Sequence, residues 1–244
     1  MTELSIAQFI QHIKLVDLTH SLNPSVPSWN GNCGFGHTLK MDYEQGCRVQ
    51  SIRMLAGIGT HIDAPSHFIK DADSVADLVV QNLFAPIALI NVSDKANASY
   101  MVSLEDILAY EAQFGRILPN SFVIAYTGWD KYWLTPHKYR NPNHDQHMEF
   151  PGFLPEAVEL LISREIVGVG IDTLSPDGSD MSFPVHHLLL GKGKYIVENL
   201  ANCQQLPPTG AYIMICPLKI EEATESPIRA IGFIPILKEN EHVI

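Results

Sequence analysis

The spacing of hydrophobic residues along the chain predicts short strands that alternate with amphipathic helices. Residues 86–93 (PIALINVS) and 121–128 (SFVIAYTG) are apolar runs bounded by turn residues, which is typical of buried strands. Between them, residues 103–115 (SLEDILAYEAQFG) start with a serine that can cap a helix, carry two acids in the first turn and end at glycine. This order of strand, helix and strand indicates the α/β class.

The same alternation continues to the end of the chain. Residues 154–165 predict a second helix, residues 166–173 a buried strand, and residues 184–193 a helix that ends at glycine. Residues 4–15 have apolar positions at near-helical spacing and predict a short helix. Further strands are predicted over residues 15–22, 48–57, 194–200, 211–220 and 228–236. We therefore predict one domain over residues 1–244, with a mixed β-sheet core flanked by helices.

Two segments lack a regular pattern. Residues 23–36 (NPSVPSWNGNCGFG) are rich in proline, glycine and asparagine and predict an irregular loop. Residues 131–150 are long and polar, and they also predict a loop. Within them, residues 143–147 (NHDQH) have the composition of a metal cluster, but we interpret them as a solvated loop.

Composition and charge narrow the functional classes. The 244 residues are 46% hydrophobic and 18% charged, which is typical of a globular protein with a sizeable core. The formal net charge of −11 gives no general attraction to the phosphate backbone of nucleic acids. No apolar run approaches the roughly 20 residues of a membrane span, and the first 20 residues lack the features of a signal peptide. We expect a cytoplasmic protein that acts on a small molecule.

The four cysteines are expected to be free thiols. Cys33, Cys47, Cys203 and Cys216 form no CxxC pair, and their spacing is not that of a small disulfide scaffold. Free thiols are typical of a reducing compartment, which agrees with a cytoplasmic location.

Residues 57–68 (GIGTHIDAPSHF) concentrate side chains that bind metals. His61 and Asp63 are two positions apart, so an extended backbone places both on one face. Imidazole and carboxylate are ordinary ligands for zinc, manganese and iron. Pro65 prevents the strand from continuing as a central ladder member, and the resulting turn could bring His67 back to the same pocket. An isolated HxD pair is more often a turn or surface feature, and the added histidine, glycines and proline strengthen the metal interpretation.

Two later segments add candidate ligands. His186 and His187 lie in a predicted helix, where one could be a packed core histidine beside an exposed one. Glu198 lies within a predicted buried strand. A buried carboxylate costs free energy unless it is paired or bound to a metal, so Glu198 is the stronger indication.

Several segments together resemble one family. They are GTHIDAPSHF, TGWDKYW, VGVGIDTLSPD, FPVHHLLLGKGKYIVENL, CPLKI and SPIRAI, in this order between Val16 and Pro235. The chain is similar to the cyclase-like metal-dependent hydrolases, the family of bacterial kynurenine formamidase and isatin hydrolase. The resemblance implies the cyclase-like, swivelling β/β/α fold.

The resemblance also implies a site. His61, Asp63, His186 and Glu198 match the family's ligands for one or two divalent ions, zinc or manganese, with Asp63 bridging if two ions bind. His186 matches the family histidine by its twelve-residue spacing to Glu198, and His187 is the fallback. His67 matches the general acid and base, and Glu198 would assist as a ligand or a base.

The chain departs from the family pattern at Gly57, where the pattern has its first histidine. Three explanations are open. The four remaining ligands could hold a single ion, or another residue could substitute, with Cys33, His37 and Cys47 as candidates. Alternatively, the fold could be retained for binding alone. Since the other four positions still carry ligand-type residues, we favour a working site of altered composition.

The resemblance implies hydrolysis of the C–N bond of an amide, a formamide or a cyclic amide by a metal-activated water. Trp29, and with less support Trp129 and Trp133, could form an aromatic wall for a planar substrate, although ordinary core aromatics are an equally good interpretation. The alternative function is a non-catalytic small-molecule binding protein on the same fold. Because family members are commonly oligomeric, the resemblance also implies a homodimer or a higher homo-oligomer.

Overall fold

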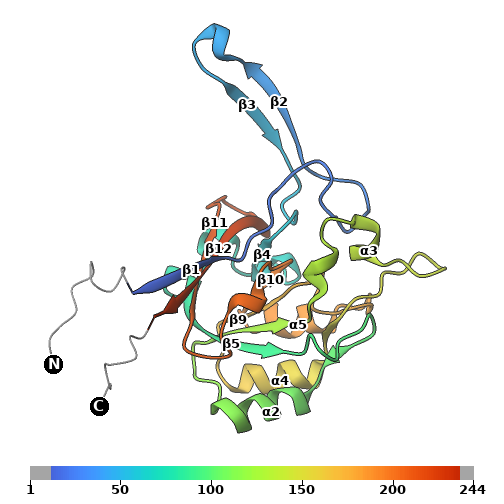
Figure 1. The fold of residues 1–244 in the computed structure, drawn as a ribbon, viewed down its shortest axis with the longest axis vertical. Coiled ribbons are helices and arrows are strands. Elements are labelled where there is room, and N and C mark those ends of the chain that lie inside the picture. Colours follow the sequence, from blue (N-terminus) through green and yellow to red (C-terminus); the bar gives the residue numbers. More distant parts are fainter. Residues whose placement is uncertain (1–11, 237–244) are drawn as a thin grey trace, which may run out of the picture.

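A computed structural model describes residues 12–236, and its central feature is one mixed sheet that closes on itself (Figure 1). The strands follow one another in the order β1 (Ile13–Asp17), β12 (Glu225–Pro235), β11 (Tyr212–Pro217), β5 (Phe84–Asn91), β7 (Phe122–Tyr126), β9 (Gly168–Ile171), β10 (Tyr195–Glu198) and β4 (His61–Asp63). Strand β12 also pairs with β4, so all of these strands except β1 form a barrel-like ring. The mixed α/β class is confirmed, but the prediction of a sheet core lying between helices needs correction because the sheet is closed.

Strand β12 closes the ring because it changes partner along its length. Its first residues, Glu225 to Pro227, pair antiparallel with β4. The following residues pair with β11, and the end of the strand pairs with β1 as well. Strand twist rotates neighbouring strands against one another, so one long strand can face different partners at its two ends.

The interior of the ring is filled by side chains that alternate along the strands. Ile62, Ile124 and Val197 belong to this inner cluster. Strand β9 contributes glycines instead: a Cβ atom at Gly170 would lie 2.8 Å from the ring of Phe122. In the sequence GVGI the glycines face the interior, where aromatic side chains leave no room for a Cβ atom.

Two helices cover the outer face of the parallel strands β5, β7 and β9 (Figure 1). They are α2 (Leu104–Phe114) and α4 (Pro155–Ser163), which lie close to the positions that the sequence predicts. The side chain of Ser103 accepts a hydrogen bond from the Asp106 backbone amide, which is the predicted helix cap. A third predicted helix, α5 (Pro184–Leu190), packs against α4 and β10.

Two predictions near the start of the chain need correction. The helix predicted over residues 4–15 is wrong for residues 13–15, which belong to β1, and residues 4–11 lie outside the described part of the chain. The strand predicted over residues 48–57 forms as β3 (Val49–Arg53), but it pairs with β2 (Gly36–Met41) in a hairpin that projects from the body (Figure 1).

Residues 131–150 are less irregular than the sequence predicts. They contain the helix α3 (Pro136–Arg140), and the side chain of Tyr139 is fully buried. The prediction fails because the aromatic residues in this polar segment pack with residues from distant segments, such as Val26 and Leu174, in a separate cluster. By contrast, His144 in the NHDQH stretch is fully exposed, as predicted.

A short parallel pair, β6 (Met101–Val102) with β8 (Gly152–Phe153), completes the strands of the described chain. The four cysteines are free thiols, as expected. Between residues 12 and 236, none of the helices has the length and apolar character needed to cross a membrane.

Candidate metal centre

Strand β4 presents His61 and Asp63 on one face, as predicted. It lies between β10 and β12, and all three of its residues are buried. Ile62 points into the interior of the ring, so His61 and Asp63 point to the opposite face. The sequence spacing of two in an extended strand therefore produces the expected convergence.

The other two predicted ligands reach the same face from distant parts of the chain. Glu198 lies at the end of β10, directly across from His61 in the antiparallel register. His186 comes from α5 and is 3% exposed, whereas its neighbour His187 is exposed to solvent. Of the two histidines, His186 is therefore the one that joins the cluster.

The distances between these side chains suit the donors of a divalent ion. The Nε2 atom of His61 lies 3.3 Å from Asp63 Oδ1 and 3.4 Å from Glu198 Oε2. The Nε2 atom of His186 lies 3.5 Å from Asp63 Oδ2 and 3.4 Å from Glu198 Oε1. Two donor atoms each about 2.1 Å from one ion at tetrahedral angles are about 3.4 Å apart.

Asp63 has the least satisfied side chain of the cluster. It is 1% exposed, and within residues 12–236 neither of its carboxylate oxygens has a hydrogen-bond partner. The imidazole nitrogens are close to it but do not make hydrogen bonds with it. Because an ionised carboxylate is costly to bury without partners, the residues present fit a cation next to Asp63.

Hydrogen bonds at the outer side of each ring direct the imidazoles toward Asp63. His61 Nδ1 lies 2.9 Å from the carbonyl oxygen of Gly59, and His186 Nδ1 lies 2.5 Å from Asp177 Oδ2. Each ring nitrogen Nδ1 donates in these pairs, which leaves Nε2 as the donor atom for a metal. Asp177 also accepts a hydrogen bond from the backbone amide of Val185 at the start of α5.

The sequence analysis did not assign a role to Asp177 or Asn199, although both lie in segments that carry the resemblance. The Asn199 side-chain amide donates to the carbonyl oxygen of Gly59, and the Thr60 hydroxyl donates to the carbonyl oxygen of Asn199. These bonds hold the turn before His61, so Asn199 positions His61 from outside the cluster.

The four predicted ligands shift one another's protonation. Burial alone would lower the pKa of His61, but Asp63 and Glu198 outweigh it and raise that pKa to about 10. Burial, together with the charge of Asp63, raises the pKa of Glu198 to about 7. Burial would also lower the pKa of His186, but the hydrogen bond that its ring donates to Asp177 and the nearby carboxylates of Asp63 and Glu198 raise it well above its ordinary value. Without a metal, the protonated imidazoles supply the positive charge that the carboxylates require.

A cavity of about 380 Å³ opens onto this cluster. Trp29, Phe68 and Phe183 line it, and the rings of Trp29 and Phe183 are 5.7 Å apart. Trp129 and Trp133 are buried in a separate aromatic cluster, where Trp133 stacks on His20. Of the three tryptophans, only Trp29 is therefore placed to contact a molecule in the cavity.

His67 lies at the edge of the cavity. It ends the turn η2 (Pro65–His67), which is where the sequence predicts that Pro65 redirects the chain. Its side chain is 29% exposed, and its Nδ1 atom lies 3.6 Å from Glu225 Oε2. His67 is therefore accessible to a bound molecule without being part of the buried ligand cluster.

None of the three substitutes considered for the missing histidine is in position. Cys33, His37 and Cys47 are absent from the cavity lining within the described chain, and Cys47 and His37 are exposed. Glu225, which the sequence analysis did not consider, does line the cavity beside Gly57.

Comparison with known proteins gives the family. The family described as "Putative cyclase" matches residues 16–178. An isatin hydrolase from Roseibium aggregatum is 37% identical over 188 residues, which cover 72% of this chain and 71% of that protein. A kynurenine formamidase from Bacillus cereus is 30% identical over 224 residues, covering 88% of this chain and 95% of that protein.

Solved structures agree with the sequence comparison. An isatin hydrolase bound to the product analogue thioisatinate superposes with a TM-score of 0.88 at 30% identity, covering 94% of this chain and 95% of that one. Isatin hydrolase A from Ralstonia solanacearum has a TM-score of 0.87 at 29% identity, covering 96% and 99%.

We expect divalent metal binding to displace protons from the site. Because the raised pKa of His61 keeps its ring protonated up to about pH 10, a metal must remove that proton at pH 7. The apparent affinity for Mn²⁺ should therefore fall as pH is lowered from 8 to about 6, where Glu198 also becomes protonated. Calorimetric titration in two buffers of different ionisation enthalpy should give about one proton or more released per ion at pH 7. Binding with no proton release would contradict the assigned ligands.

Proposed function

Because the chain belongs to the "Putative cyclase" family, we propose that it is a metal-dependent hydrolase that cleaves the C–N bond of a small amide, formamide or cyclic amide. The observation that carries this proposal is the buried Asp63 carboxylate, which has no hydrogen-bond partner among the described residues and faces two imidazoles. The relatives named as isatin hydrolase and kynurenine formamidase support the C–N bond as the target.

In this proposal His61, Asp63, His186 and Glu198 hold a divalent ion, with zinc and manganese as the candidates. Imidazole nitrogen and carboxylate oxygen suit both metals. When bound, such an ion lowers the pKa of a water molecule from 15.7 to about 7 and polarises a carbonyl group. The chain contributes a dry site, fixed ring orientations from Gly59 and Asp177, and carboxylates that keep the ion in place.

His67 is the residue that we assign to proton transfer. It lines the cavity, and histidine exchanges protons near neutral pH. It would accept a proton from the attacking water and return one to the leaving nitrogen, so that the amine leaves as a neutral group. Glu225 Oε2 lies 3.6 Å from His67 Nδ1. Glu198 would assist as a ligand, and its pKa of about 7 also suits a base.

The cavity lining supports a planar substrate. Trp29, Phe68 and Phe183 offer apolar ring surfaces next to the polar cluster. An aryl amide can place its ring against these side chains while its carbonyl faces Asp63 and the histidines. Isatin and N-formylkynurenine are therefore the first compounds to test, since the relatives' names point to this chemistry.

The alternative, a binding protein without catalysis, makes a different prediction for the same compounds. Such a protein would bind a planar ligand in the cavity with the same affinity before and after chelation of metals. For a hydrolase with this site, chelation removes turnover and a divalent ion restores it.

Replacing His67 by glutamine should lower kcat for the hydrolysed amide by about 10²- to 10⁴-fold, because proton transfer by a positioned side chain contributes about that much. The bound metal should be unaffected, since His67 lies outside the four-residue cluster. The same measurement on His187→Gln, an exposed histidine on α5, is the matched control and should match the unmodified protein. An unchanged kcat in His67→Gln, with metal retained, would show that another group transfers the proton.

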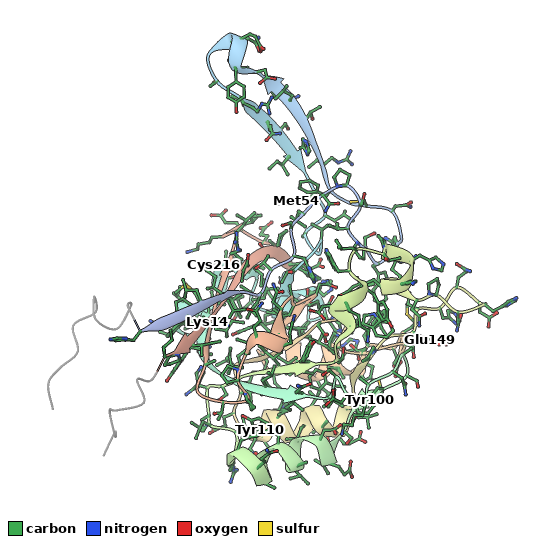
Figure 2. All side chains as sticks on the ribbon, in the orientation of Figure 1. Lys14, Met54, Tyr100, Tyr110, Glu149 and Cys216 are labelled. Carbon is green, nitrogen blue, oxygen red and sulfur yellow. The ribbon has the colours of Figure 1, made fainter. Side chains whose placement is uncertain are left out.

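We also propose that the protein associates with a second copy of itself through the β2–β3 hairpin. Every residue of β3 is exposed, and the hairpin carries exposed apolar side chains such as Leu39, Tyr43 and Ile52. In Figure 2 these strands stand clear of the body beyond Met54. Since a two-stranded hairpin alone is marginally stable in water, a partner covering it is physically favoured.

Light scattering during size-exclusion chromatography tests this association. We expect a mass of a dimer or more for the unmodified chain of 27.1 kDa, and a monomer for Ile52→Glu, because a charge would then be buried in the contact. Val80→Glu makes a similar change at an exposed apolar position outside the hairpin, and it should keep the mass of the unmodified protein. A monomeric unmodified protein would contradict the proposal.

The cytoplasmic location is a further part of the proposal. It is supported by the four free thiols, which are typical of reducing compartments. Fractionation of the source cells with antibody detection would test it, and recovery in an extracellular fraction would oppose it.

A further inference from the structure

The ligand-type side chains around Asp63 fall into two groups. The donor atoms of Asp63, His186 and Glu198 all lie within 4.8 Å of one another. So do the donor atoms of His61, Asp63 and Glu225. Asp63 belongs to both groups, and it has two carboxylate oxygens without hydrogen-bond partners in the described chain, one for each group.

We infer that Glu225 is a metal ligand that replaces the side chain missing at Gly57, so that the protein holds two divalent ions bridged by Asp63. The first ion would be bound by His61, Asp63 and Glu225, and the second by Asp63, His186 and Glu198. This inference rests on the proposed metal-dependent function and specifies its metal site.

The Glu225 carboxylate fills the space that a side chain at position 57 would occupy. A Cβ atom at Gly57 would lie 2.0 Å from Glu225 Oε1, which is far inside van der Waals contact. The same Cβ would lie 3.3 Å from His61 Nε2, so a side chain at position 57 would extend toward the first ion position. A side chain at position 57 would therefore force the flexible end of Glu225 to move away from His61.

The closed sheet holds Glu225 in this place. It lies directly across from Asp63 in the antiparallel pairing of β12 with β4, just as Glu198 lies across from His61 in the pairing of β10 with β4. Residues opposite one another in antiparallel strands share a face and have Cβ atoms about 4.5–5.5 Å apart. The Ala64 backbone amide also donates to the carbonyl oxygen of Thr224, which fixes the start of β12.

Charge supports a ligand role over a packing role. Asp63, Glu198 and Glu225 bring three carboxylates to one site, and like charges at short range destabilise one another in a buried place. When the histidines are neutral, one divalent ion leaves a negative excess on the three carboxylates, whereas two ions neutralise all three and leave a positive excess that suits an anionic ligand. The substitution of carboxylate for imidazole at the first position keeps a donor atom and adds a negative charge.

A different role for Glu225 is to orient His67, because Glu225 Oε2 lies 3.6 Å from His67 Nδ1. The two roles predict different results. An orienting carboxylate affects turnover and leaves the number of bound ions unchanged. A ligand affects the number of ions, whether or not a substrate is present.

The first experiment counts Mn²⁺ on the full chain. The protein is stripped with a chelator, loaded with Mn²⁺, separated from free ion by gel filtration and measured by elemental analysis. We expect about two equivalents in the unmodified protein and about one in Glu225→Gln, with affinity at the first position reduced by at least about tenfold, since even outer-shell partners are worth about 10- to 100-fold. Glu221→Gln makes the same charge change at an exposed turn position before β12 and should keep two equivalents.

The second experiment moves the ligand-type side chain from position 225 to position 57 and the glycine from position 57 to position 225. Gly57→His alone should push the flexible Glu225 carboxylate away from the first ion position, because the new Cβ atom would lie 2.0 Å from Glu225 Oε1. Glu225→Gly alone should keep its fold and bind one Mn²⁺. The double variant Gly57→His with Glu225→Gly should bind two again, because histidine at position 57 then reaches the first position from the other side. Circular dichroism of all variants separates loss of an ion from loss of the fold.

The outcomes distinguish this inference from the proposed function on which it rests. No bound ion in the unmodified protein would overturn both. One equivalent in the unmodified protein, or two equivalents in Glu225→Gln, would overturn only the role of Glu225 and leave a single-ion hydrolase. Failure of the double variant to regain the second ion, with its fold intact, would also count against the exchange of positions 57 and 225.

Discussion

The burial of the Asp63 carboxylate constrains everything around it. An ionised carboxylate without hydrogen-bond donors is costly in a protein interior, and both oxygens of Asp63 lack donors among residues 12–236. The imidazoles of His61 and His186 lie on two sides of this carboxylate. Hydrogen bonds from their Nδ1 atoms direct the Nε2 atoms toward Asp63. The cavity that opens onto this cluster is lined by aromatic side chains and by His67.

Closure of the sheet is what brings these groups together. Strands β10, β4 and β12 contribute one face on which Glu198, His61, Asp63 and Glu225 lie in cross-strand pairs. Helix α5 adds His186 from outside the ring. A flat sheet with β12 and β4 at opposite edges would keep Glu225 far from Asp63, so the composition of the site depends directly on the topology.

The sequence predicts those parts of the structure that depend on local pattern. The helices α2, α4 and α5 follow from spacing and caps, and the shared face of His61 and Asp63 follows from the period of an extended strand. Glu198 could be anticipated because a charge in an apolar strand needs a partner. The structure brings these residues together, while their roles as ligands stay a prediction.

The parts that could not be predicted depend on contacts between distant segments. Glu225 meets Asp63 only because β12 pairs with β4, and no local signal marks that pairing. The resemblance indicates that Gly57 stands where the family pattern has a histidine, but it does not indicate where a substitute would lie. The burial of aromatic residues within residues 131–150 could not be predicted either, because their sequence neighbours are polar. Tyr139 is buried by contacts with residues from other segments.

Whether Asp63 lies at a divalent-ion site is tested by the metal content of the protein purified without an affinity tag, measured beside an Asp63→Ala variant. Asp63 is shared by both ligand groups, so its removal should abolish binding altogether instead of reducing it. We predict at least about one equivalent of zinc, manganese or iron per chain in the unmodified protein and none in the variant, with the circular dichroism spectrum retained. Absence of metal from both proteins, even after incubation with excess Zn²⁺ and Mn²⁺, would contradict the account.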